Sequence, residues 1–119
     1  MSKGSLFVGW GAIIPGREKA AQNALQDAIA YLSRLKGAAE IDGFTPVLLE
    51  PHGGDLEGFV LLEGDRDSLA RLRTSEEFVR TIVGVQLVHS KVGVVTAYTG
   101  DGLGQLLAIW DQQESKLLA

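Results

Sequence analysis

Apolar positions along this 119-residue chain follow two alternating patterns. Some runs are apolar on both faces of an extended backbone and rich in β-forming residues, which predicts buried strands. These strands are expected at residues 6–14, 44–50, 57–63 and 88–98. In other stretches apolar residues recur every three or four positions, which predicts amphipathic helices. These helices are expected at residues 17–38, in two short segments within 65–85, and at 101–116.

The resulting element order is βαββαβ with a C-terminal helix, an α+β arrangement. Right-handed crossovers place the four antiparallel strands in the order 4-1-3-2. This order makes the strand at 44–50 an edge strand, and Pro46 lies in it. Proline has no N–H to donate to a neighbouring strand and is tolerated at sheet edges, so the topology and the sequence agree.

The helices can cover only one face of this sheet, yet the strands carry apolar residues toward the other face as well. A solvated sheet face normally shows polar residues at alternate positions. A second copy of the chain is therefore expected to cover it, giving a homodimer through the sheet faces. The whole chain, 1–119, is expected to form one domain with its core at about 6–98.

Composition narrows the classes of partner. Hydrophobic residues at 45% and charged residues at 22% are typical of a folded globular domain. A net charge of −4 argues against binding nucleic acid or an anionic membrane. The absence of cysteine excludes disulfides, thiolate catalysis and cysteine-ligated metals. No membrane span or signal peptide is recognised, so a cytoplasmic protein is expected, and no cofactor is expected.

The segment 50–57 holds the densest group of polar side chains. If Gly53 and Gly54 form a two-residue turn, the flanking side chains face one another across it. The candidate metal or acid–base group consists of Glu50, His52, Asp55 and Glu57. The alternative is a longer, solvated loop with separated charges, and in that case no metal is bound.

Four further residues are candidates for contacting a ligand. Trp10 and Tyr98 lie on strands expected to be neighbours and could line an aromatic pocket, or simply pack in the core or interface. His89, at the start of the last strand, could act as an acid, a base or a haem ligand, or lie partly exposed at the strand end. Glu63 would become a base if buried, although its position before a turn favours exposure.

The chain shares three features with one superfamily: the element order, the doubly apolar strands and the run Gly64-Asp65-Arg66-Asp67-Ser68-Leu69-Ala70-Arg71-Leu72-Arg73-Thr74-Ser75-Glu76-Glu77-Phe78. In these features it resembles the dimeric α/β-barrel superfamily with ferredoxin-like protomers. That superfamily includes small antibiotic-biosynthesis-type monooxygenases, stress-responsive barrel proteins and muconolactone isomerase-like enzymes. The resemblance implies two sheets packed into a barrel. It carries no catalytic residue across, because no active-site motif matches.

Two functions remain open at this point. The first is an uncharacterised homodimeric barrel protein that binds a small apolar or aromatic ligand or serves as an accessory protein. The alternative is a cofactor-independent monooxygenase or isomerase acting on an aromatic or polyketide-like molecule. Fold alone does not separate them.

Overall fold

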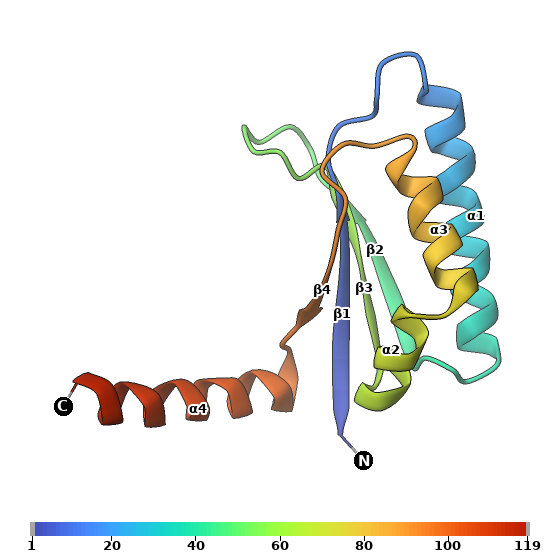
Figure 1. The fold of residues 1–119 in the computed structure, drawn as a ribbon. Coiled ribbons are helices and arrows are strands. Elements are labelled where there is room, and N and C mark those ends of the chain that lie inside the picture. The colour runs from blue at the N-terminus through green and yellow to red at the C-terminus, as the bar shows by residue number, and fades with distance from the viewer. Residues whose placement is uncertain (1, 119) are drawn as a thin grey trace.

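The computed structural model describes residues 2–118 (Figure 1). Within these residues, four strands and four helices follow one another in the predicted order, β1-α1-β2-β3-α2-α3-β4-α4. The strands are β1 Lys3–Trp10, β2 Gly43–Leu48, β3 Gly58–Asp65 and β4 Gly93–Ala97. The helices are α1 Glu18–Gly37, α2 Arg66–Arg73, α3 Glu76–Gln86 and α4 Gly100–Leu118.

The strands form one antiparallel sheet in the order β2-β3-β1-β4, which confirms the predicted 4-1-3-2 topology. Strands β1 and β3 are central and pair over their full length, with Leu6 opposite Leu62 and Val8 opposite Val60. Pro46 lies on the edge strand β2, where no ladder needs its missing N–H.

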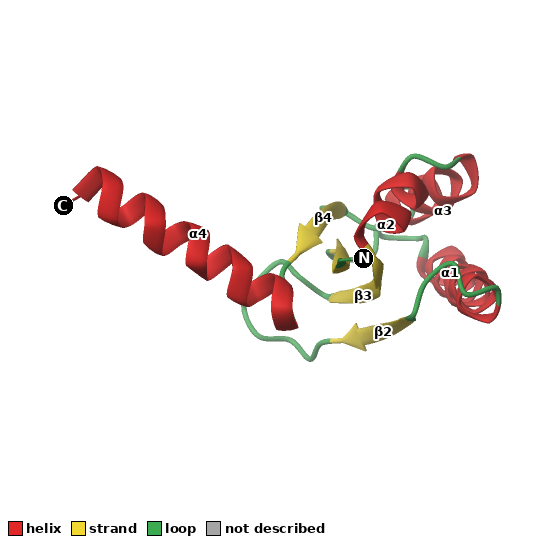
Figure 2. Ribbon diagram, turned by 90° about the horizontal axis from the view of Figure 1, so that it is seen from below, coloured by secondary structure: helices red, strands yellow, loops and turns green. Residues whose placement is uncertain are grey.

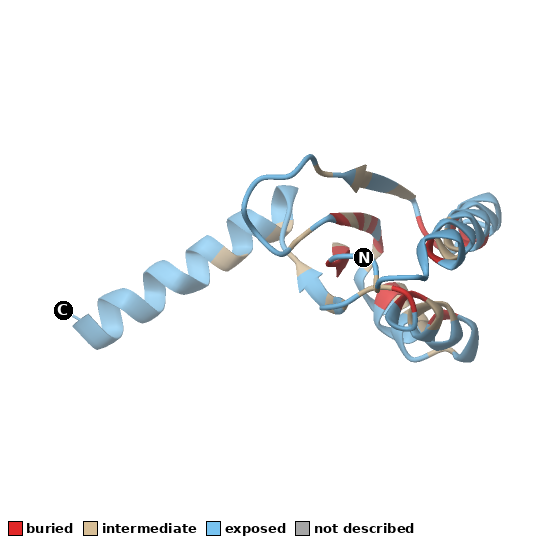
Figure 3. Ribbon diagram, turned by 90° about the horizontal axis from the view of Figure 1, so that it is seen from above, coloured by how far each residue is buried: buried red, intermediate tan, exposed pale blue. Residues whose placement is uncertain are grey.

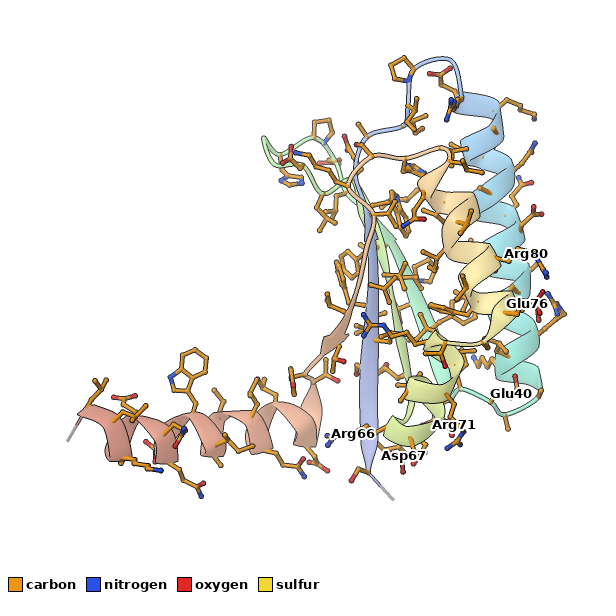
Figure 4. All side chains as sticks on the ribbon, in the orientation of Figure 1. Glu40, Arg66, Asp67, Arg71, Glu76 and Arg80 are labelled. Atoms are coloured by element: carbon orange, nitrogen blue, oxygen red, sulfur yellow. The ribbon has the colours of Figure 1, made fainter. Side chains whose placement is uncertain are left out.

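Three helices pack on one face of the sheet (Figures 1 and 2). Alternate residues of β1 and β3 point toward them and are buried, and Leu62 is fully enclosed. Helix α1 contributes one apolar stripe to the same layer, while charged pairs such as Glu76–Arg80 lie on the outer surface of α3 (Figure 4). The core comprises Leu6, Val8, Trp10, Tyr31, Leu32, Leu35, Ile41, Val60, Leu62, Leu69, Phe78 and Val85.

Two helix caps, at Asp65 and Ser75, separate α2 from β3 and α3 from α2. The carboxylate of Asp65 accepts the backbone N–H of Ser68 at 3.0 Å, and this bond holds the pKa of Asp65 below its usual value. The hydroxyl of Ser75 accepts the backbone N–H of Phe78. These caps satisfy N–H groups that the first turn of a helix leaves unpaired, so the chain can change direction twice within about ten residues.

The other face of the sheet carries apolar side chains that none of these three helices covers. Phe7 of β1 and Phe59 of β3 stack there with ring centroids 5.2 Å apart. By register, Leu61 and Val95 flank Phe7 on the same face, and Val95 is 53% exposed. We call this surface, formed by Phe7, Phe59, Leu61 and Val95, the open face. Its composition is the one predicted from the doubly apolar strands.

Helix α4 leaves the end of β4 on the side of the open face and points away from the body of the protein (Figures 1 and 2). None of its residues is buried (Figure 3). Its tertiary contacts are chiefly with β1 near its first turn. Within residues 2–118, no helix has the length and apolar content needed to cross a membrane.

Candidate functional site

Trp10 anchors a small site at the C-terminal end of β1. Its indole lies across the neighbouring strand, directly over Gly58, its cross-strand partner. A Cβ atom added at Gly58 would come within 2.8 Å of the Trp10 ring, which is closer than carbon atoms pack. Glycine at position 58 therefore makes the space that the indole occupies, and Trp10 is only 7% exposed.

His89 faces this indole, with the two ring centroids 5.9 Å apart. Its Nδ1 atom lies 3.0 Å from the carbonyl oxygen of Gly11. A carbonyl oxygen only accepts hydrogen bonds, so Nδ1 carries the hydrogen when this bond forms. In the neutral imidazole, Nε2 is then left with its lone pair. The bond to Gly11 thus fixes the orientation of the His89 ring.

The backbone around His89 corrects the predicted strand bounds. Strand β1 ends at Trp10 rather than at residue 14, and β4 begins at Gly93 rather than at residue 88. Residues 11–14 and 88–90 still pair, through three backbone hydrogen bonds and a bridge between Ile13 and His89. The pairing brings Gly11 so close to Ser90 that a Cβ on Gly11 would lie 2.9 Å from the Ser90 carbonyl oxygen.

Trp10 and His89 lie at one end of a cleft between α1 and the sheet. The cleft encloses about 30 Å³. This space has room for one or two water molecules and is smaller than a typical small-ligand site, so a ligand could enter only if side chains of the lining move. The lining is Trp10, Ala24, Leu25, Ala28, Ile29, Leu32, Pro46, Val60, Val85 and His89. His89 is the only titratable residue in that lining.

The segment between β2 and β3 is a long loop, which corrects the prediction of a two-residue turn at Gly53 and Gly54. The ladder ends at Leu48 opposite Gly58, and residues 49–57 project beyond it (Figure 1). The His52 ring bonds the carbonyl oxygen of Leu56 through Nε2 at 2.8 Å, and Asp55 pairs with Lys91 at 2.7 Å. That ion pair holds the pKa of Asp55 below its usual value.

The four candidate metal ligands of this loop do not converge. Glu50, His52, Asp55 and Glu57 are all exposed. Across residues 2–118, no group of three or more histidine, aspartate or glutamate side chains is placed to hold a metal ion. The loop geometry therefore matches the solvated arrangement with separated charges.

Tyr98 and Glu63 lie away from the cleft. Tyr98 follows Ala97, which pairs with Ser5 near the start of β1, whereas Trp10 ends that strand. Tyr98 and Trp10 are thus about 20 Å apart along the sheet and do not share a pocket. Glu63 pairs with Ser5 and is exposed. Of the four ligand candidates, the structure brings together Trp10 and His89.

The sequence interpretation missed three contributors to the cleft. Gly58 provides the floor beneath Trp10, and Ala24 and Ala28, one turn apart on α1, leave the cleft unfilled. The signals that could have revealed them were a glycine at the start of a buried strand and small residues in the apolar stripe of a helix.

Comparison of the sequence with protein families and with curated proteins finds no match. Comparison of the structure finds clear neighbours. A dimeric ferredoxin-like protein of unknown function from Jannaschia sp. CCS1 is 14% identical, with a TM-score of 0.64 over 82% of this chain and 100% of its own. A Dabb family protein with a ferredoxin-like fold from Mesorhizobium loti is 13% identical, with a TM-score of 0.63 over 83% and 99%. The fold is ferredoxin-like.

A third neighbour has a described activity. A variant of SnoaB, a cofactor-independent oxygenase from Streptomyces nogalater, is 13% identical, with a TM-score of 0.57 over 84% of this chain and 97% of its own. These neighbours share the ferredoxin-like fold that the sequence resemblance implies. At such identities the similarity establishes the fold and leaves the activity open.

Replacing Gly58 by alanine should displace the Trp10 indole, because the new methyl group would overlap the ring. We expect a loss of about 1–3 kcal/mol in the free energy of unfolding, typical of overpacking, together with a change in tryptophan fluorescence. Gly93→Ala is the matched control, since an added Cβ there meets no atom within 4 Å. Equal effects of the two substitutions in urea unfolding would contradict the packing of Trp10 on Gly58.

Proposed function

We propose that this chain is a homodimeric protein that binds a small apolar or aromatic molecule in the cleft between Trp10 and His89. The observation that carries the proposal is the pairing of an indole face with a single oriented imidazole in an otherwise apolar cleft. Apolar walls with one or two placed polar groups are the usual construction of a small-molecule site. A flat ligand would stack on Trp10 and offer a hydroxyl to His89 Nε2.

The walls of the cleft suit a ligand larger than the enclosed volume. Ile29 lines the cleft and is 37% exposed. Ala24 and Ala28 present only methyl groups from α1. Entry of an aromatic ring therefore requires rotation of one or two side chains at the mouth, with the sheet left in place.

The open face supports the homodimeric part of the proposal. Phe7, Phe59, Leu61 and Val95 form a contiguous apolar surface at the centre of the sheet. A surface of this kind on a single chain usually marks an interface. Two of the structural neighbours are described as dimeric ferredoxin-like proteins. By analogy with them, a second copy of this chain is the expected cover for the open face.

The alternative function is a cofactor-independent oxygenase or isomerase that acts on an aromatic or polyketide-like substrate. The observation that favours it is the free Nε2 of His89, because an imidazole is suited to accept a proton from a substrate hydroxyl near neutral pH. The SnoaB neighbours supply the precedent of such an oxygenase on this fold. Both functions use the same cleft, so they differ only in whether the bound molecule reacts.

Blocking the cleft mouth should abolish ligand binding. We expect 2-naphthol to bind the wild-type protein and Ile29→Phe to weaken that binding at least about tenfold, by filling the space above Trp10. Val79→Phe is the control, because Val79 is an exposed apolar residue outside the cleft. Titration calorimetry measures both. No heat of binding across a panel of naphthols and other fused-ring aromatics would argue against a ligand site.

Placing a charge on the open face should separate the protomers. Val95→Asp is expected to give a folded monomer at micromolar concentration, because Val95 is half exposed in one chain but would be buried between two sheets. Val79→Asp on α3 should remain dimeric. Light scattering gives the mass of each variant, and a monomeric wild-type protein would refute the dimer directly.

Oxygen uptake distinguishes the two functions. If the protein is an oxygenase, addition of a hydroxylated fused-ring substrate should consume oxygen, and His89→Gln should reduce the rate by about 100-fold or more while leaving binding within a few fold. If it is a binding protein, 2-naphthol binds without oxygen consumption or any change in its absorption spectrum. If the protein is an isomerase, the absorption spectrum of the substrate should change without oxygen consumption.

A further inference from the structure

Helix α4 has an apolar side, as helices that pack against a partner do, yet it makes few contacts with the rest of the described chain. Most of its apolar residues fall on one side, at the spacing of a buried stripe, with Ile109 outside that stripe and Glu114 within it. Trp110, in the stripe, is 66% exposed. The side chains of α4 extend into open space along most of its length (Figure 4). The apolar side consists of Leu103, Leu106, Leu107, Trp110 and Leu117.

The start of α4 is a poor helix former, so its order needs support from packing. Gly100, Gly102 and Gly104 occupy its first two turns, and glycine weakens a helix more than any residue except proline. Helices of this length owe most of their stability in proteins to tertiary contacts of an apolar face. Within residues 2–118, the contacts of α4 with the rest of the chain are few and lie near its first turn.

The direction of α4 indicates what covers it. The helix leaves β4 on the side of the open face and runs away from the sheet (Figure 2). Sheets packed face to face lie about 10 Å apart, whereas a 19-residue helix is about 28 Å long. Any second sheet seated on the open face would therefore have α4 alongside it, and α4 would extend past that sheet toward the helices behind it.

Charge and length argue for a second copy as the occupant. Helix α4 carries Asp101, Asp111 and Glu114 against a single Lys116, which is the opposite of the basic polar face that binds anionic membranes. The structural alignments include nearly the whole length of these three neighbours but only 82–84% of this chain. This chain is thus longer than those neighbours, and α4 accounts for 19 of its 119 residues.

We infer that α4 is an exchanged arm: in the homodimer proposed above, each protomer packs the Leu107–Trp110 side of its α4 against the flank of the other protomer. The two arms, one from each protomer, would then pack beside the sheet-to-sheet interface at its opposite ends. The inference rests on the proposed homodimer and adds to it a specific contact outside the sheets.

Two substitutions one residue apart test the arm in the full-length protein. Leu107→Asp places a charge on the apolar side of α4 and should raise the dimer dissociation constant about tenfold or more. Ala108→Asp places the same charge on the opposite, polar side and should leave it within about twofold. Analytical ultracentrifugation over a dilution series measures both. Equal dissociation constants for the two variants would overturn the inference.

Trp110 provides an independent readout. In a Trp10→Phe background Trp110 is the only tryptophan, and acrylamide should quench it weakly in the dimer and strongly after dilution to monomer. A dimer with fully quenchable Trp110 would refute the arm and leave the homodimer intact. A monomeric protein would refute both. A Val95→Asp monomer with shielded Trp110 would mean that α4 folds onto its own sheet, and would also overturn the inference.

Discussion

A four-stranded sheet has two faces, and this chain provides a helical layer for only one of them. Burying the first face between the sheet and α1, α2 and α3 forms the core around Leu62. The second face cannot be made polar without altering the central strands, because β1 and β3 place Phe7, Phe59 and Leu61 there. The need to cover these residues connects the otherwise separate features of the molecule: the doubly apolar strands, the outward helix α4 and the expected second copy.

The candidate site lies within the covered face, between α1 and the sheet. Trp10 fits against the sheet only because Gly58 offers no side chain, and α1 passes over this region with Ala24 and Ala28. A large ring beside small residues leaves a space that neither helix nor sheet fills. His89 enters that space from a segment held to residues 11–14 by backbone hydrogen bonds. Its orientation is therefore set by the same pairing that closes this end of the sheet.

The sequence predicted those features that depend on periodicity and on local chemistry. The element order and the edge position of Pro46 follow from spacing and from single residue types, and the structure confirms them. The helix bounds agree within a few residues for the same reason. The open face was predictable because the strands carry apolar residues on both faces, a signal that does not depend on the register between strands.

The sequence could not predict features that depend on register or on backbone path. Residues 11–14 remain apolar after β1 has ended, and Lys91 takes a positive φ of 53° that its neighbours do not indicate. The glycine pair in the β2–β3 loop suggested a tight turn, although the ladder had already ended at Leu48. Trp10 ends β1, and Tyr98 directly follows the adjacent strand β4. Only the register of β1 against β4 places them at opposite ends.

The composition of the cleft limits the chemistry that it can support. Reactions that build charge on an acyl or phosphoryl group need several donors aimed at that charge, and the lining offers one imidazole among apolar side chains. A single oriented base is sufficient for one task, the removal of a proton from a substrate that stabilises the resulting anion itself. Fused-ring hydroxyaromatics have this property, and their flat faces also suit Trp10. Trp10 and His89 are thus sufficient to bind such a molecule. The catalysis that they could support is a reaction in which the substrate stabilises its own anion after losing a proton.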